Sequence, residues 1–288
     1  MIYQLKYYPL WVVILVSFFS LHSLSYIPSS KMIFERVVEN SVKLPLYIEL
    51  DLNISQGDQT VFLKEQWLIE SENSIRILVK GDKEFKDQIS FQVTDKDNQG
   101  NTYLSGTNKT KIRPLMEKVL IFKKTEQIKQ FLVQQGILKE EEINSVNFKK
   151  IPGNSGFQYQ PELFIRLGRV DGGISYIFGP KPRNENPVPG LWVEQDQFFV
   201  RKIRNIQGDE IQFDKITTFS RNTRWTKVLE YFWRGNKGNG HARAQVTNVK
   251  IPDTNQRAFF TKFLDKKSPY FEQSSQRPLI EDFYQRFR

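Results

Sequence analysis

The sequence predicts an α+β protein that consists mostly of antiparallel β-sheet. Aromatic residues make up 14% of the 288 residues, and bulky aromatic side chains fit a pleated, half-buried surface. Segments such as residues 47–55 and 88–94 alternate apolar and polar side chains, which is the pattern of a half-buried strand. In residues 189–204 (PGLWVEQDQFFVRKIR) two apolar runs flank the polar turn of residues 195–197, which predicts a hairpin.

The chain begins its folded part with a predicted helix over residues 29–40. Ser29 or Ser30 can cap it, and apolar residues recur after it at helical spacing. Twelve candidate strands follow, at residues 47–55, 60–69, 75–79, 88–94, 101–107, 163–168, 174–178, 191–194, 198–204, 210–220, 225–233 and 242–251. Most are separated by short turns, so we expect each strand to pair with the one before it.

Helices interrupt this pattern twice. Residues 125–145 read as a helical insertion, with Thr125 as the N-cap of its first helix and Gly136 at the C′ position. Residues 114–122 are ambiguous between a helical turn and a strand, and residues 151–160 read as a loop. After the last strand, an aromatic helical tail over residues 256–288 is expected to dock on the body.

The N-terminus reads as an export signal. Lys6 precedes an apolar run over residues 10–21, and small residues follow near the expected cleavage point, so residues 1–25 are assigned as a signal peptide. An uncleaved N-terminal anchor is the other interpretation of the same run. Residues 26–255 then form one domain that contains the insertion and carries the tail.

Composition excludes several kinds of chemistry. The chain has no Cys, so disulfides, thiol chemistry, Cys-based zinc sites and lipid attachment to Cys are excluded. Only His241 remains beyond the signal, which excludes a His-cluster metal site. The net charge of +10 becomes +9 without Lys6. For an exported chain, this charge favours an anionic membrane surface over nucleic acid, or is simply the cationic excess of a solvated surface.

No catalytic motif is present. The sequence lacks G-x-S-x-G, H-E-x-x-H and a Walker loop, and the glycine-rich run RGNKGNG at residues 234–240 joins two predicted strands without the G-K-[ST] ending. We therefore predict no catalytic residue, no cofactor and no metal. A carboxylate pair of the glycosidase kind remains open, because no spacing singles one out.

Two groups of residues are candidates for binding. The first is a set of tryptophans that would line a lipid or glycan cavity, with core packing as the alternative: Trp67, Trp192, Trp225 and Trp233. The second is a cationic patch that would meet head groups or a membrane surface, with a solvated sheet face as the alternative: Arg201, Lys202, Arg204, Arg221 and Arg224.

Several of these patterns together resemble the LolA/LolB-like outer-membrane lipoprotein-sorting family. They are the helix over residues 32–38 before YIELDLNI, the hairpin VFLKEQWLIESENSIRILVKG, the hairpin LWVEQDQFFVRKIR and the following IQFDKITTFS. The resemblance spans roughly residues 32–251. It implies a strongly curved sheet of about 11 strands, a half-open and unclosed barrel whose apolar concave face is covered by helices and holds acyl chains.

The resemblance also implies a function. It predicts a monomeric, non-enzymatic carrier or chaperone for lipid or lipoprotein acyl chains, in the periplasm of a Gram-negative envelope or anchored at the inner membrane. The insertion at residues 125–145 and the aromatic tail depart from the family pattern, and either would plug the cavity. The alternatives are a non-catalytic envelope binding or structural module with a filled core, and a carbohydrate-active enzyme on a β scaffold.

Overall fold

The structure is a computed structural model that describes residues 27–81, 88–94, 102–104, 115–143, 148–150, 157–159, 162–182, 187–220, 223–235, 238–263 and 277–288. The predicted signal or anchor, residues 1–25, and Arg221 lie outside the described residues. None of the helices in these ranges is long and apolar enough to span a lipid bilayer.

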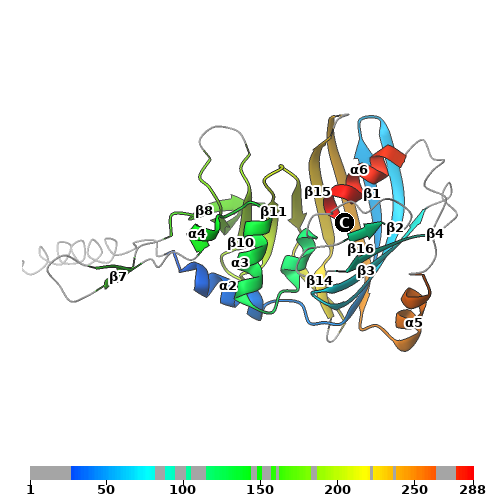
Figure 1. The fold of residues 1–288 in the computed structure, drawn as a ribbon, viewed down its shortest axis with the longest axis horizontal. Coiled ribbons are helices and arrows are strands. Elements are labelled where there is room, and N and C mark those ends of the chain that lie inside the picture. Colours follow the sequence, from blue (N-terminus) through cyan, green and yellow to red (C-terminus); the bar gives the residue numbers. More distant parts are fainter. Residues whose placement is uncertain are drawn as a thin grey trace, which may run out of the picture.

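A single 12-stranded antiparallel sheet forms the frame of the molecule (Figure 1). Its strands are β1 (Leu46–Gln56), β2 (Gln59–Ser71), β3 (Ser74–Gly81), β4 (Gln88–Thr94), β5 (Thr102–Leu104), β8 (Ile165–Val170), β9 (Gly173–Phe178), β10 (Gly190–Glu194), β11 (Val200–Arg204), β12 (Glu210–Phe213), β15 (Val228–Gly235) and β16 (Gly238–Lys250). Their order across the sheet is β5-β4-β3-β2-β1-β16-β15-β12-β11-β10-β9-β8.

Chain neighbours pair through most of this sheet, as the alternating segments predict. β16 lies between β1 and β15 and so joins the N-terminal strands to the later ones. Because β5 and β8 remain at the two ends of the order, the sheet does not close into a barrel. The predicted α+β class, mostly antiparallel and unclosed, is confirmed.

Two predicted long strands are each divided. Residues 210–220 form β12 and a separate strand β13 (Ile216–Ser220), and residues 225–233 belong to β14 (Thr223–Thr226) and β15. β13 and β14 pair with each other outside the main sheet. The break is held by Thr226, whose hydroxyl donates to the carbonyl groups of Asp214 and Val228 at 3.1 and 2.8 Å.

Two further segments differ from, or refine, the sequence prediction. The loop expected over residues 151–160 contains a strand, β7 (Phe157–Tyr159), which pairs with β6 (Phe148–Lys150). The ambiguous residues 114–122 contain a 3-10 helix, η1 (Met116–Leu120), whose five residues are all buried. Burial on the sheet therefore decides a segment whose local pattern is indecisive.

Five α-helices complete the described fold: α2 (Ser30–Glu39), α3 (Thr125–Gln134), α4 (Glu140–Ile143), α5 (Thr254–Phe263) and α6 (Arg277–Phe287). Ser29 caps α2 as predicted, since its hydroxyl accepts from the backbone N–H of Met32. The predicted N-cap Thr125 is wrong. Lys124 occupies that position, because the side chain of Gln127 accepts a hydrogen bond from the backbone N–H of Lys124.

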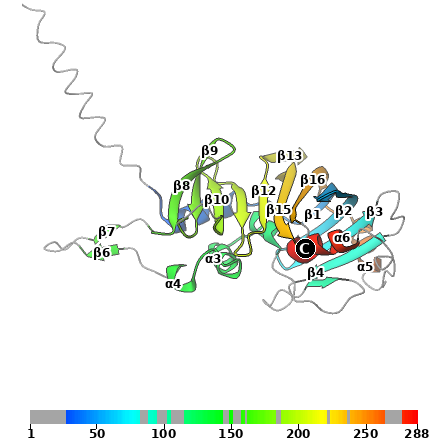
Figure 2. The same cartoon turned by 90° about the horizontal axis from the view of Figure 1, so that it is seen from above.

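The core lies on one face of the sheet. Alternate residues of β1, such as Ile48 and Leu50, join one buried cluster with side chains of α2, η1, α3 and α6. In Figure 2 the strands from β15 to β4 bend around α6, which lies on the same side as α3. We call this side the concave face. On the opposite face, Phe260 of α5 packs in a small cluster with Tyr47 and Leu68.

Small residues on β16 make the concave face deep beneath α6. Gly240, Ala242 and Ala244 point to this face and pair with Trp233, Tyr231 and Leu229 of β15. A side chain at Gly240 would place its Cβ 2.0 Å from the Trp233 indole, so the absence of a Cβ is what lets the indole lie across β16. The glycine-rich run thus serves packing in a hairpin rather than phosphate binding.

We predict that Gly240→Ala lowers the free energy of unfolding by about 1–3 kcal/mol, because the added methyl displaces a buried indole. Chemical denaturation measures the change. Gly173→Ala is the matched control, since its Cβ would meet no described heavy atom closer than 3.5 Å, and we expect a change within about 0.5 kcal/mol. Equal effects would contradict the proposed role of Gly240.

Candidate functional site

The candidate site is the part of the concave face that α6 covers. The helix presents one apolar face to the sheet, and its buried residues are Leu279, Ile280, Phe283, Tyr284 and Phe287. The rings of Phe283 and Phe287 lie 5.2 and 5.1 Å from that of Tyr231, edge to face, and both lie 5.8 Å from Trp233. Burial of each such side chain stabilises docking by about 1.5–3 kcal/mol.

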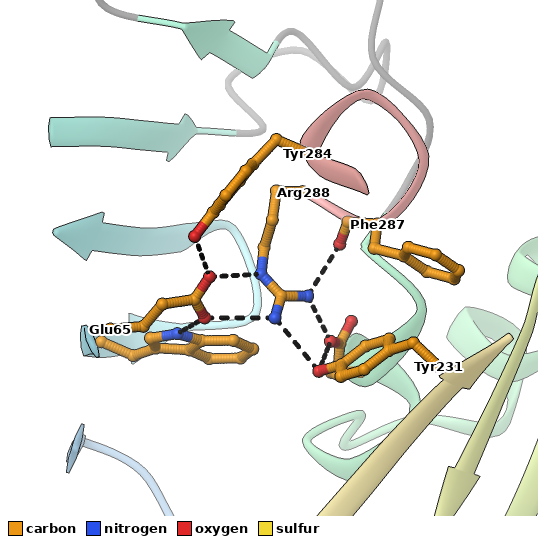
Figure 3. Close-up of polar contacts among 7 residues, drawn as sticks. Glu65, Tyr231, Tyr284, Phe287 and Arg288 are labelled. Atoms are coloured by element: carbon orange, nitrogen blue, oxygen red, sulfur yellow. Dashed lines mark hydrogen bonds and ion pairs between the residues drawn. The ribbon is translucent and has the colours of Figure 1, made fainter. Parts of the chain in front are cut away.

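A buried ionic cluster lies beneath the end of α6 (Figure 3). Arg288 follows the helix and is 1% exposed. Its guanidinium donates to Glu65 of β2 at 3.1 Å and to Glu117 of η1 at 2.6 Å. Two tyrosine hydroxyls complete the cluster: that of Tyr284 donates to Glu65 at 2.5 Å, and that of Tyr231 donates to Glu117 at 2.7 Å. Charges removed from water in this way are stable only when paired and hydrogen-bonded.

Aromatic rings surround the same guanidinium. The Arg288 Cζ atom lies 4.7 Å from the centroid of Trp67 and 5.1 Å from that of Tyr231. The Trp67 indole N–H donates to Glu65 at 2.8 Å, which orients that carboxylate. The site therefore combines two carboxylates with two aromatic faces, which is an arrangement suited to a cation.

Burial shifts the ionisation of the cluster. Desolvation raises the pKa of Glu117 above its ordinary value, although Arg288 and the Tyr231 hydroxyl oppose that shift. Desolvation also raises the pKa of Tyr231 and of Tyr284 well above the usual value. For Arg288, desolvation acts to lower the pKa, but the interactions with Glu65, Tyr231, Glu117 and Tyr284 together outweigh it, and the pKa lies well above its ordinary value. The guanidinium is therefore the fixed charge of the cluster.

A second set of polar contacts holds the middle of α6. Asp282 accepts a hydrogen bond from the Trp233 indole N–H at 2.8 Å. Arg286 forms ion pairs of 2.8 Å with Asp282 and with Asp209, which lies in the connection between β11 and β12 and is fully buried. Within the described residues, side chains make these contacts, and α6 shares no backbone ladder with the sheet.

The four predicted tryptophans do not share one place. Trp67, Trp225 and Trp233 all lie in the buried cluster of the concave face, and Trp67 and Trp233 contact α6 or Arg288. Trp192 lies on the opposite face, because its neighbours Leu191 and Val193 point into the core. Its indole is covered by the cations of Lys202 and Arg204, at 5.0 and 5.8 Å.

The cations of the predicted patch contact several different partners. Lys202 and Arg204 pack on Trp192 and share one carboxylate, that of Glu210. Arg201 is 8% exposed and faces Asp171 at 3.9 Å. Arg224 is exposed on β14, over the ring of Phe199 at 5.4 Å. A role for these cations at a membrane surface stays a prediction.

Sequence reasoning missed the central charged residues: Glu65, Glu117 and Arg288. One signal was present. Glu65 occupies an inward position of β2, in phase with Leu63 and Trp67, and its neighbours Lys64 and Gln66 point outward. A lone acid on an apolar face requires a buried partner. Nothing in the local sequence identifies Arg288 as that partner, because the two residues are 223 positions apart.

The two carboxylates also bear on the enzyme alternative. Glu65 and Glu117 converge on Arg288 beneath α6, and both are at most 1% exposed. In this arrangement a substrate has no access to them, and both are paired with Arg288. Among the described residues, no group of His, Asp and Glu is arranged to hold a metal ion.

An open cleft of about 650 Å³ lies elsewhere, between α2, the β10–β11 turn and Arg224. Its lining contains as many cations as carboxylates, since Arg36 pairs with Glu39 at 2.9 Å, and Arg224 and Asp196 also line it. Within the lining, the side-chain amide of Asn40 donates to the carbonyl of Gln197 at 2.7 Å. The cleft is therefore a weaker candidate for a binding site than the face beneath α6.

Comparisons with known proteins concern the fold. No protein-family model matches the sequence, and no curated protein matches it. A LolA superfamily protein from Nitrosomonas europaea is 11% identical, with a TM-score of 0.44 and coverage of 81% of this chain and 98% of that chain. A putative outer membrane lipoprotein-sorting protein domain from Vibrio parahaemolyticus is 7% identical, with a TM-score of 0.41 and coverages of 80% and 95%.

A third solved structure, a DUF1329 family protein from Desulfovibrio piger, is 12% identical, with a TM-score of 0.41 and coverages of 81% and 98%. Two of the three carry the family names that the sequence pattern resembles. At such identities the likeness concerns the arrangement of the chain and not its ligands.

We predict that Arg288→Ala lowers the free energy of unfolding by about 3–5 kcal/mol, because two buried carboxylates lose their cation. Arg243→Ala is a matched control. The Arg243–Glu230 and Arg288–Glu117 pairs both measure 2.6 Å, but Arg243 is 54% exposed, so its loss should cost about 0–1 kcal/mol. Urea denaturation of both variants tests this, and similar losses would contradict a buried, paired Arg288.

A further prediction concerns pH. Glu117 ionises at a higher pH when folded than the ordinary 4.5, so the folded chain keeps a proton there that the unfolded chain has lost. The contribution of this group is fully present below pH 4.5 and is lost as the pH rises through the folded pKa. Relative to wild type, Glu117→Gln should therefore lose less stability between about pH 4.5 and 7. Parallel curves for wild type and Glu117→Gln would refute the assignment.

Proposed function

We propose that this protein is an exported, periplasmic carrier that binds lipid or lipoprotein acyl chains on the concave face, in the place that α6 occupies here. The observation that carries the proposal is the way α6 is attached. It covers the aromatic surface of Tyr231 and Trp233 through side chains, while the sheet beneath keeps its complete backbone pairing. Removing α6 would expose an apolar hollow without breaking a strand.

The apolar energies of helix docking and of acyl-chain binding support a reversible displacement of α6 by a ligand. The five buried apolar side chains of α6 contribute about 7–15 kcal/mol to docking, taken at 1.5–3 kcal/mol each. An acyl chain of about 14 methylenes would contribute about 11 kcal/mol in the same place, at 0.8 kcal/mol each. Because these two apolar contributions are similar, an acyl chain can replace the apolar contacts of the helix, while the ion pairs of Arg286 and Arg288 favour the return of the helix when the ligand leaves.

Charge and targeting support the proposed location. The apolar run near the N-terminus is a signal or an anchor, and the net positive charge favours approach to anionic envelope surfaces. We propose a monomer that performs no chemistry, since neither the sequence motifs nor the buried carboxylates provide an accessible catalytic group.

A second candidate is a non-catalytic envelope binding or structural module with a permanently filled core. The observation that favours it is the packing itself: Leu279, Ile280 and the aromatic residues of α6 are nearly all inaccessible to solvent. The two candidates differ in one property, which is whether α6 ever leaves the concave face.

We predict that Arg286→Ala binds the uncharged apolar fluorophore N-phenyl-1-naphthylamine more tightly than wild type does. Loss of the ion pairs to Asp209 and Asp282 weakens α6 docking. The apparent dissociation constant should fall about tenfold for each 1.4 kcal/mol by which docking is weakened. Arg36→Ala is the control, because Arg36 forms an exposed ion pair on α2.

Hydrogen exchange locates the binding event. With the fluorophore bound, amides of residues 277–288 should exchange faster while those of β1 and β16 remain protected. Native mass spectrometry of gently purified protein should show bound lipid. If neither wild type nor Arg286→Ala binds the fluorophore or carries lipid, the carrier proposal is refuted and the filled-core module stands.

A further inference from the structure

We infer that the concave site selects amphiphiles whose polar group is a cation, such as an alkylguanidinium or an alkylammonium. The inference rests on the proposed function, in that a ligand takes the place of α6. It goes further by naming the polar group that this place recognises. The structure supplies the evidence in the form of the group that occupies the place now, the guanidinium of Arg288.

The anionic half of the cluster does not belong to α6. Glu65 is on β2 and Glu117 is on η1, so both remain when the helix and Arg288 move away. Glu65 then keeps the hydrogen bond from the Trp67 indole, and Glu117 keeps the one from the Tyr231 hydroxyl. The Oε2 atom of Glu117 accepts no hydrogen bond within the described part of the chain even with α6 in place. Carboxylates that line an apolar hollow favour a cation as their partner.

The walls of the hollow also favour a cation. Trp67 and Tyr231 remain with the sheet, and their rings lie 4.7 and 5.1 Å from the guanidinium carbon. Attraction between a cation and an aromatic face is strongest when water is excluded, as it is here, where both rings are at most 1% exposed. An alkylguanidinium can therefore make the same contacts as Arg288 without the helix.

The same geometry disfavours an anionic head group in this place. A phosphate or carboxylate would lie against Glu65 and Glu117 and would lose its hydration with no donor in exchange except the indole and one hydroxyl. The second polar contact adds to this effect, because Asp209 is buried and loses Arg286 when α6 leaves. Three carboxylates then face the hollow or its rim from β2, η1 and the β11–β12 connection.

The side chains of α6 and Arg288 indicate the chemistry of the ligand that would replace them. The helix has an apolar face, the cation of Arg288 follows its end, and that cation contacts Glu65 (Figure 3). The complementary small molecule has an alkyl chain for the surface of Tyr231 and Trp233, and one guanidinium or ammonium group for Glu65 and Glu117.

The test uses the full chain and three probes of equal length: n-octylguanidine, n-octanol and octanoate. Isothermal titration at pH 7, below the aggregation limit of each probe, gives the dissociation constants. We expect octylguanidine to bind at least about tenfold more tightly than octanol, and octanoate to bind more weakly than octanol. In the double variant Glu65→Gln, Glu117→Gln this preference should disappear.

A second measurement tests whether octylguanidine can replace the guanidinium that Arg288→Ala removes. Arg288→Ala leaves both carboxylates without their cation, and octylguanidine should raise its melting temperature more than that of wild type. Octanoate should not raise it. If Arg288→Ala does not fold, Arg288→Met keeps the apolar stem and serves the same comparison, and the wild-type titration stands independently.

The outcomes separate the two proposals. If octanol binds and octylguanidine binds no better, the cation preference is refuted while the carrier function stands. If octanoate binds most tightly, the cation preference is likewise refuted. If no probe binds to wild type or to any variant, both the carrier function and the cation preference are refuted.

Discussion

The rest of the structure depends on one buried ionic cluster. Arg288, Glu65 and Glu117 come from three elements that are far apart in the chain, and none of them is tolerable alone in an apolar interior. Each carboxylate is stabilised by a cation beside it, and the guanidinium of Arg288 provides that cation for both. This requirement fixes α6 over β2 and η1 more specifically than apolar packing does, because an apolar helix could slide on an apolar surface at little cost.

The sheet is shaped to receive this helix. Its concave face combines very large side chains on β15 with very small ones on β16, so that the indole of Trp233 lies flat where Gly240 has no side chain. The depth that results is filled by Phe283 and Phe287. A hollow that suits a helix of this width also suits an acyl chain, and this is why the filled face and a carrier function are compatible.

The polar end of the hollow narrows what such a carrier would hold. Apolar burial is nondirectional and distinguishes poorly among lipids, whereas two carboxylates beneath aromatic rings distinguish sharply between a cation and an anion. The positive charge of the whole chain acts at longer range and on the outside, where it favours an anionic surface. The outer surface and the inner site therefore have opposite electrostatic preferences.

Local pattern alone determined the class of the fold. The alternation in β1 and β4, the cap at Ser29 and the turns between strands predict a mostly antiparallel sheet with an initial helix, because strand and helix periodicity are properties of neighbouring residues. It also predicted helices within residues 125–145 and 256–288, where α3 and α6 lie. It did not reveal that residues 210–220 divide, since Thr226, whose hydroxyl donates to the carbonyl of Asp214 at the break, lies on a different segment.

The site was decided by tertiary structure. An inward position for Glu65 follows from strand phase, but its partner Arg288 is 223 residues away, and only the docking of α6 brings them together. For Trp192 the sequence leaves two faces open, and the core contacts of Leu191 and Val193 choose between them. Contacts between distant segments depend on how whole elements pack, and no local pattern records that choice.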